Sequence, residues 1–175
     1  MSINRPRVVL PRITVLALLL LVGQHVVSVQ AATDLSGAEA PDFVLKSVSG
    51  ANYRLSEYRG DVVVVSFSAN WCGDCRALLS ELNEWHRTYQ GAGLKLLAIS
   101  LDRRVDDASD TASGLGLEYP VLHDAELEVG RAYDVGNMPV SVLIDRDGIV
   151  RHVEEGFRRS EAQAFLDRVR DLLRE

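Results

Sequence analysis

The chain has 175 residues, of which 47% are hydrophobic, and its formal net charge at pH 7 is −6. This length and apolar content suit one domain with one core. The sequence pI of about 5.2 argues against a nucleic-acid binder, which would show a basic patch or stripe. The chain has no repeat of roughly 20 to 50 residues and no low-complexity tract, which excludes solenoid architectures and long linkers.

Residues 1–31 have the pattern of an export signal. The segment has no acidic residue, and its apolar run follows three arginines: Arg5, Arg7 and Arg12. Val29-Gln30-Ala31 has the small-residue spacing of a signal-peptidase site. We therefore predict a signal peptide that is cleaved after Ala31.

An uncleaved membrane anchor through residues 13–29 is the alternative. Gln24 and His25 interrupt the apolar run before it reaches the roughly 20 residues that a spanning helix needs, so cleavage is favoured. Either way we expect an exported, periplasmic domain, soluble or tethered to the inner membrane. Disulfides form and persist in such a compartment.

The rest of the chain predicts an α/β domain. Residues 32–40 are small and polar and predict a flexible lead-in to one folded domain over residues 41–175. The apolar run Val62-Val63-Val64-Val65 predicts a central strand that is buried on both faces of a parallel sheet. Apolar periodicity and turn residues predict the other elements. In chain order these are a hairpin at 42–55, the central strand, a helix at about 72–90, a strand at 94–101, a helix within 102–116, an edge strand at 119–122, a short helix at 126–133, strands at 140–144 and 149–153, and a last helix opened by a Ser160–Gln163 capping box.

The two cysteines of the chain lie where the central strand ends and the first helix begins, in Trp71-Cys72-Gly73-Asp74-Cys75. A helix N-terminus supplies N–H groups and about half a positive charge, which stabilise a thiolate. An exposed Cys72 would attack a partner disulfide, and the more enclosed Cys75 would resolve the mixed disulfide. A structural disulfide is the alternative, but a bridge across so few residues closes too small a loop to stabilise the fold much.

With this order of elements, the chain resembles the thioredoxin superfamily, and within it the exported TlpA/ResA group of thiol–disulfide oxidoreductases. The resemblance implies a thioredoxin-like α/β fold: a central mixed β-sheet with helices on both faces, an N-terminal β-hairpin and an inserted strand–helix segment over residues 102–124. It covers roughly residues 40–173 and rests on Ala40-Pro41-Asp42-Phe43, the strand–CxxC–helix unit, Met138-Pro139 before a strand, and Leu143-Ile144-Asp145-Arg146-Asp147-Gly148.

The resemblance also implies an activity. The protein would reduce disulfides in other proteins through a Cys72–Cys75 cycle, in cytochrome c maturation or thiol homeostasis. Its partners would be cysteine-containing exported proteins and a membrane thiol-reducing electron donor. Pro139 would have a cis peptide bond, with the Met138 backbone set against the disulfide to pair with an incoming chain. The other residues that would shape the site are Trp71, which would pack over it, Gly73 and Asp74.

Several positions depart from the patterns of thioredoxin and of ResA-like proteins. Ser66 stands on the central strand where thioredoxin keeps a buried acid, as is common in the TlpA/ResA group, so the proton-transfer residue stays open. Neither Asp102 nor Asp106 clearly matches the Glu near the site of ResA-like proteins. Asp74 replaces a Pro, and a carboxylate a few Å from Cys72 would oppose the thiolate by about 1–4 kcal/mol and favour a reductant. Alternatively, Asp74 points into water and contributes little.

Two alternative functions agree less well with the residues of this chain. A copper-handling module would use Cys72 and Cys75 as soft Cu(I) ligands, with Met138 as a third, but related copper-delivery proteins have a wider cysteine spacing and a matching His. A peroxiredoxin-like peroxidase would need Thr and usually Pro at positions where this chain has Ala69 and Val65. The chain has no H-E-x-x-H motif and no Gly-rich phosphate loop, so we expect no metal and no cofactor.

Overall fold

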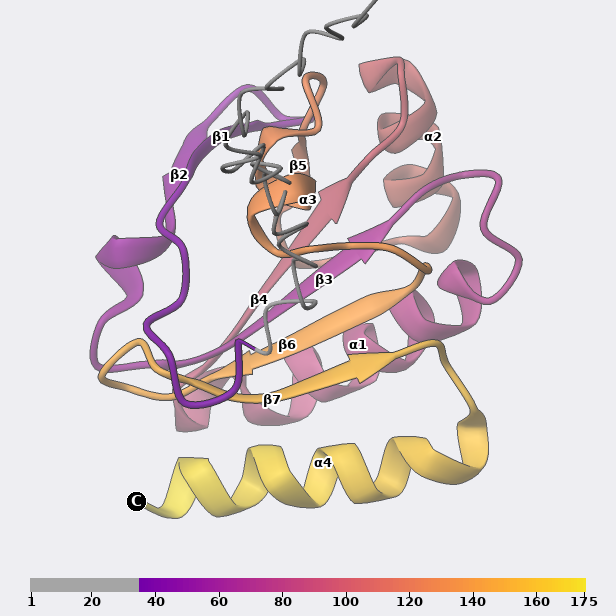
Figure 1. Ribbon diagram of the computed structural model, residues 1–175. Coiled ribbons are helices and arrows are strands. Elements are labelled where there is room, and N and C mark those ends of the chain that lie inside the picture. The colour runs from indigo at the N-terminus through magenta and orange to yellow at the C-terminus, as the bar shows by residue number, and fades with distance from the viewer. Residues whose placement is uncertain (1–34) are drawn as a thin grey trace, which may run out of the picture. The chain divides into compact units, whose positions relative to one another are not determined.

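The computed structural model describes residues 35–175, whose arrangement Figure 1 shows. The predictions of a signal peptide, of cleavage after Ala31 and of a tether through residues 13–29 concern a stretch outside the described residues. Within residues 35–175, no helix combines the length and the apolar character that crossing a membrane requires.

In the described part of the chain, a seven-stranded sheet forms the centre of the fold, in the order β2-β1-β5-β4-β3-β6-β7 (Figure 1). The pairs β3–β4 and β4–β5 are parallel and the other pairs are antiparallel, so the predicted mixed sheet is confirmed. The strands are β1 (Val44–Ser47), β2 (Asn52–Arg54), β3 (Val62–Ser68), β4 (Leu94–Ser100), β5 (Val121–His123), β6 (Val140–Ile144) and β7 (Val150–Glu155).

Helices cover both faces of this sheet, as predicted. On one face, Leu78, Ala108 and Phe165 belong to one apolar cluster, which places three helices there. On the other face, Val129 and Phe43 belong to a second cluster, contributed by a short helix and by the segment before β1. The three helices of the first face are α1 (Cys75–Tyr89), α2 (Val105–Leu115) and α4 (Arg159–Arg174), and the short helix is α3 (Glu128–Ala132).

β3 is the central strand, and all of its residues are buried. Successive side chains of a strand point to opposite faces. Val62 and Val64 therefore pack under α1 and α4, whereas Val63 and Val65 pack in the second cluster. β3 pairs in parallel with β4 and antiparallel with β6. The prediction of a strand buried on both faces is confirmed, but one of its two neighbours is antiparallel.

The predicted edge strand at 119–122 is wrong. β5 lies inside the sheet, because β1 of the hairpin pairs with it through Lys46 and His123. Pro120 comes one residue before β5, and its carbonyl accepts a hydrogen bond from the Ala98 N–H at 3.0 Å. The missing N–H of the proline therefore falls outside the strand and does not confine β5 to an edge.

Two predicted helix starts are also wrong. α1 begins at Cys75 rather than Cys72, and the N–H of Cys75 donates to the Cys72 carbonyl across a turn at 3.3 Å. The last helix begins at Arg159 without a side-chain cap, so the predicted capping box at Ser160 does not form. Instead, Arg158 donates through Nε to the Glu161 carboxylate at 2.8 Å, and this acid lies in the first turn, where the helix dipole favours a negative charge.

Candidate active site

Cys72 and Cys75 are joined by a disulfide at the start of α1. The S–S distance is 2.04 Å and the two Cα atoms are 5.4 Å apart. Cys75 is the first residue of α1, and Cys72 lies in the preceding turn, where its N–H donates to the Ala69 carbonyl at 3.1 Å. The sulfurs therefore lie at the positive end of the helix, which favours a thiolate there once the bond is reduced.

Cys72 is more accessible to solvent than Cys75, as predicted. Cys72 is 7% exposed and Cys75 is 1% exposed. The more accessible residue is Cys72, but the expectation that it is exposed is wrong for this disulfide form. Its sulfur is bonded to a residue at the enclosed start of α1, and this bond holds the side chain inward.

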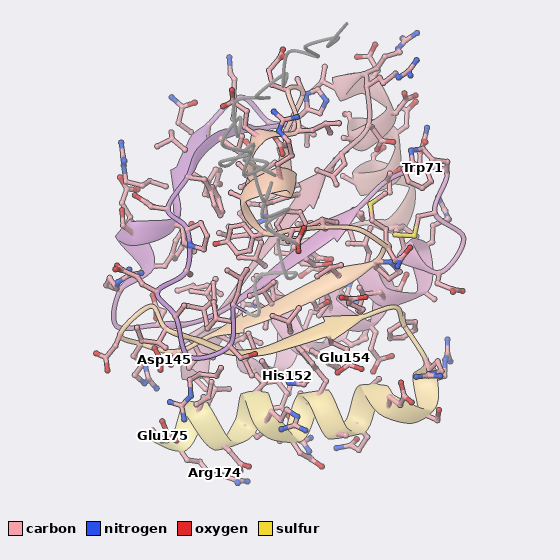
Figure 2. All side chains as sticks on the ribbon, viewed as in Figure 1. Trp71, Asp145, His152, Glu154, Arg174 and Glu175 are labelled. Carbon is pink, nitrogen blue, oxygen red and sulfur yellow. A yellow bond between two sulfur atoms is a disulfide. The ribbon has the colours of Figure 1, made fainter. Side chains whose placement is uncertain are left out.

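Trp71 projects from the loop that carries the cysteines, as Figure 2 shows. Its side chain is 71% exposed, so the expectation that it packs down over the site is wrong for this form. A hollow of about 340 Å³ lies beside it, lined by Asn70, Trp71, Asp102, Arg103 and Asp107. A large apolar side chain next to a hollow is a common feature of a binding surface.

Asp102 anchors the loop that carries the cysteines. It is 3% exposed, and its Oδ1 accepts a hydrogen bond from the Asn70 N–H at 2.9 Å while its Oδ2 accepts one from the Ser100 hydroxyl at 2.8 Å. A ring nitrogen of His123 lies 2.8 Å from the Asp102 carbonyl oxygen. Both carboxylate oxygens are thus engaged, and one of them holds the backbone two residues before Cys72.

The sequence contained a signal for this role of Asp102. Asp102 is the first charged residue after the buried strand β4, which runs parallel to β3. Because the carboxyl ends of parallel strands meet at one edge of a sheet, an acid there lies near the loop that follows β3. Asp106, the other acid considered, is exposed and pairs with Arg104 at 2.9 Å.

Met138 and Pro139 are joined by a cis peptide bond, as predicted. Pro139 comes directly before β6, whose first residue Val140 pairs with Phe67 near the carboxyl end of β3. The cis bond therefore lies at the end of the sheet where β3 leads into the cysteine loop. Met138 is half-buried and Pro139 is buried.

Gly73 and Asp74 are both exposed between the cysteines. A Cβ atom at Gly73 would meet no atom within 4 Å, so packing does not require glycine there. Asp74 occupies the N-cap position of α1, but its side chain makes no capping hydrogen bond. Of the two alternatives for Asp74, this geometry favours the one in which its carboxylate points into water.

The histidines of the described chain do not form a common site. The His86 ring packs against Tyr119, with ring centroids 5.8 Å apart, and burial lowers the pKa of His86. His152 lies 2.8 Å from the Glu154 carboxylate, on another strand from His123. Over residues 35–175, no three His, Cys, Asp or Glu side chains are grouped closely enough to hold a metal ion.

The fold and the site define a thioredoxin-like protein with a CxxC disulfide at the start of a helix. Residues 36–153 match the model of the AhpC/TSA family. This match covers more than half of the chain, and the chain belongs to the AhpC/TSA family.

Similar proteins of known name indicate which class of thioredoxin-like protein this is. The chain is 34% identical over 125 residues to the thiol-disulfide oxidoreductase ResA of Geobacillus thermodenitrificans (strain NG80-2), covering 71% of this chain and 72% of that protein. It is 28% identical over 134 residues to ResA of Bacillus anthracis, covering 76% and 78%. A solved structure described as a thiol:disulfide interchange protein DsbE from Chlorobium tepidum has a TM-score of 0.76 and 34% identity, covering 79% of this chain and 97% of that chain. The protein is a thiol–disulfide oxidoreductase, as the resemblance implied.

Replacing Asp102 with Ala should lower both stability and activity. The variant leaves the buried Ser100 hydroxyl and the part-buried Asn70 N–H without their acceptor, which costs about 1–3 kcal/mol in the free energy of unfolding. Because Asn70 precedes Cys72 by two residues, insulin reduction should also slow severalfold. Urea denaturation and a turbidity assay measure the two effects.

Asp106→Ala is the matched control, because it removes an exposed acid whose ion pair with Arg104 is worth about 1 kcal/mol or less. Asp102→Asn, which keeps one acceptor oxygen, should lie between the wild type and Asp102→Ala. Equal effects of Asp102→Ala and Asp106→Ala would contradict the role of Asp102 in holding the loop.

Proposed function

We propose that this protein is an exported protein-disulfide reductase of the periplasm. A membrane thiol-reducing donor supplies electrons to the Cys72–Cys75 disulfide. The resulting dithiol reduces cysteine-containing exported proteins, in cytochrome c maturation or thiol homeostasis. The observation that carries the proposal is the disulfide at the start of α1, beside the exposed Trp71.

Two exchange steps make up the reaction. The Cys72 thiolate attacks one sulfur of the partner disulfide, which forms a mixed disulfide and releases the other partner sulfur as a thiolate. Cys75 then loses its proton and attacks Cys72, which forms the Cys72–Cys75 bond and releases the second partner sulfur. Both electrons come from the dithiol of the reductase, and both partner sulfurs end as thiols.

The partner chain would bind next to the cysteine loop. The hollow beside Trp71 would receive a side chain of the partner, and the indole would cover apolar surface near the scissile disulfide. Met138 precedes β6 at the same end of the sheet, so its backbone would pair with an extended segment of the partner. This arrangement would place a partner cysteine over Cys72 rather than over Cys75, which is almost fully enclosed.

Cys75→Ser should trap partners as mixed disulfides, because the second step cannot occur without the Cys75 sulfur. Cys72→Ser should trap none, because the remaining thiol lies at the enclosed start of α1. Non-reducing gels of the two variants, purified from the periplasm of an expressing cell, compare the adducts. Adducts that form through Cys72→Ser instead would reverse the assignment of the attacking sulfur.

The reduction potential of the Cys72–Cys75 pair should lie near or below about −270 mV, the value of thioredoxin, rather than near the roughly −120 mV of a strong oxidase. No Lys, Arg or His stands between the cysteines. Asp74 is exposed, so Asp74→Asn should stabilise the thiolate only slightly and raise the potential by no more than about 30 mV. Equilibration in glutathione buffers measures both values.

The matched control for this measurement is Glu57→Gln, which removes an exposed acid before β3, at the end of the strand away from the cysteines. This variant should keep the wild-type potential. A wild-type value above about −180 mV, the level of protein disulfide isomerase, would reverse the proposed direction of electron flow.

Export makes a prediction of its own. Expressed from its full sequence in a Gram-negative cell, the protein should be recovered from the periplasmic fraction with Ala32 as its first residue. Mass spectrometry of the purified protein identifies that residue. A chain that keeps residues 1–31 and sediments with the inner membrane would favour the tether through residues 13–29, and a chain retained in the cytoplasm would refute export.

A further inference from the structure

Three polar residues form a row across one face of the sheet. Ser66 on β3 pairs directly with Ser141 on β6, and Ser141 pairs directly with Glu154 on β7. Directly opposed residues of antiparallel strands point to the same face, with Cβ atoms about 4.5–5.5 Å apart. The row therefore runs from the central strand to the edge strand β7 on the face that α1 and α4 cover.

The two hydroxyls of this row lack protein partners. Ser66 is 1% exposed and Ser141 is 3% exposed, and neither hydroxyl has a hydrogen-bond partner among residues 35–175. The two hydroxyls thus do not bond each other. Buried hydroxyls are nearly always bonded to protein or to an ordered water, so these two indicate a place for water on this face of the sheet.

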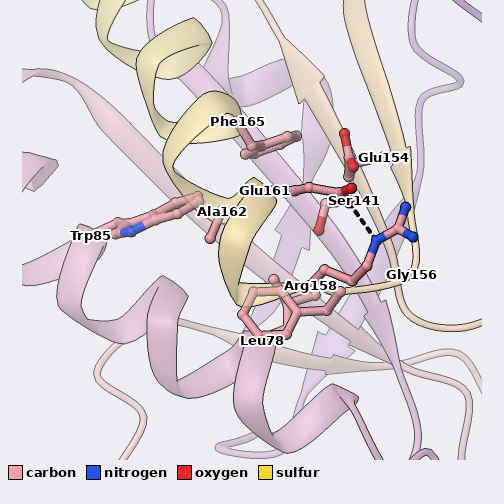
Figure 3. A pocket seen from close by; sticks show the side chains of 10 residues that line it. Leu78, Trp85, Ser141, Glu154, Gly156, Arg158, Glu161, Ala162 and Phe165 are labelled. Atoms are coloured by element: carbon pink, nitrogen blue, oxygen red, sulfur yellow. Dashed lines mark hydrogen bonds and ion pairs between the residues drawn. The ribbon is translucent and has the colours of Figure 1, made fainter.

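A pocket opens onto the outer part of this row, at Ser141 and Glu154, as Figure 3 shows. Its volume is about 20 Å³ and its lining includes Leu78, Ser141 and Glu154, which is room for one water molecule. Glu154 is 34% exposed at its side chain, and its Oε2 lies 2.8 Å from a ring nitrogen of His152. The outer end of the row therefore reaches solvent, whereas the inner end is sealed.

The chemistry of Cys75 creates a need for such a route. Cys75 is 1% exposed, yet its thiol must lose a proton before it can attack the mixed disulfide. Cys75 begins α1, and Leu78, three residues further on the same helix face, lines the pocket. No titratable side chain of β3 itself can accept the proton, because its residues are Val, Ser and Phe.

We propose that Ser66, Ser141 and a water bound in the pocket beside Ser141 relay the proton of Cys75 to the Glu154 carboxylate, and from there to solvent. This inference deepens the proposed function, on whose second exchange step it rests. Cys75 gives up its proton to the relay and its sulfur forms the bond to Cys72, while the partner sulfur leaves with the electron pair of the broken bond. Glu154 then releases the proton to solvent, and the departing partner thiolate takes up a proton from solvent.

The charged groups around Glu154 come from each element that packs near it. His152 is its neighbour on β7. Arg158 and Glu161 lie at the start of α4, where they pair with each other. On α1, Glu81 accepts a hydrogen bond from the Trp85 indole, which lines the same pocket. Each of these groups titrates or carries charge, so the control variants must leave them in place.

A single-turnover reaction with dithiobis(nitrobenzoate) separates the two exchange steps. The reduced protein releases one thionitrobenzoate when Cys72 attacks the reagent and a second one when Cys75 closes the disulfide. Ser141→Ala and Glu154→Gln should slow the second release about tenfold or more, as loss of general-base assistance does, and should leave the first release unchanged. The second release should also lose its wild-type pH dependence in Glu154→Gln.

Ser141→Thr, which restores a hydroxyl, should recover the second release. Glu155→Gln is the matched control, because Glu155 is an exposed acid on the opposite face of the same strand and should behave as the wild type. If Ser141→Ala does not fold, which circular dichroism detects, Glu154→Gln alone decides. A second release that is unchanged in Glu154→Gln would overturn the relay, whereas a missing first release in the wild type would refute the role of Cys72 instead.

Discussion

The burial of β3 on both of its faces is the constraint on which the rest of the structure depends. A strand whose every side chain is buried must lie in the middle of its sheet, with covering layers above and below. Its two neighbours are β4, which runs parallel to it, and β6, which runs against it. The carboxyl end of β3 is therefore the place where β4 ends with Ser100 and where β6 begins after Pro139.

This convergence explains the site. The loop that follows β3 crosses that end of the sheet. There it lies near the residues that follow β4 and precede β6. Asp102 holds the loop through the Asn70 N–H, and the cis bond at Pro139 lies on the other side. The loop then enters α1 at Cys75, so the sulfurs lie at the positive end of a helix whose other turns are packed against β3.

The local parts of this arrangement could be predicted from the sequence. The valine run identifies β3, and the leucine spacing after the cysteines identifies the buried face of α1. The order of strands and helices suffices to place both cysteines at a strand-to-helix junction. These features depend on residues close together in the chain, where apolar periodicity is informative.

Features that depend on contacts between distant residues could not be predicted in the same way. The interior position of β5 follows from its pairing with β1. The paired residues Lys46 and His123 are 77 positions apart in the sequence. The start of α4 is an exception, because Arg158 and Glu161 are only three residues apart and pair with each other, while no side-chain cap forms. The role of Asp102 required knowing that β4 lies directly beside β3.

Asp102 and the two buried serines differ in how their burial is compensated. Asp102 has both of its carboxylate oxygens bonded, so its burial is compensated by the loop that it holds. Ser66 and Ser141 have no such compensation from protein groups of the described chain, and burying an unbonded hydroxyl costs about 1–3 kcal/mol. Packing does not require a hydroxyl in this row. Ala98 on β4 pairs with Ser66 and extends the same row by one position. An apolar residue fits there, so packing alone does not account for the hydroxyls at 66 and 141, whereas the proposed proton relay would.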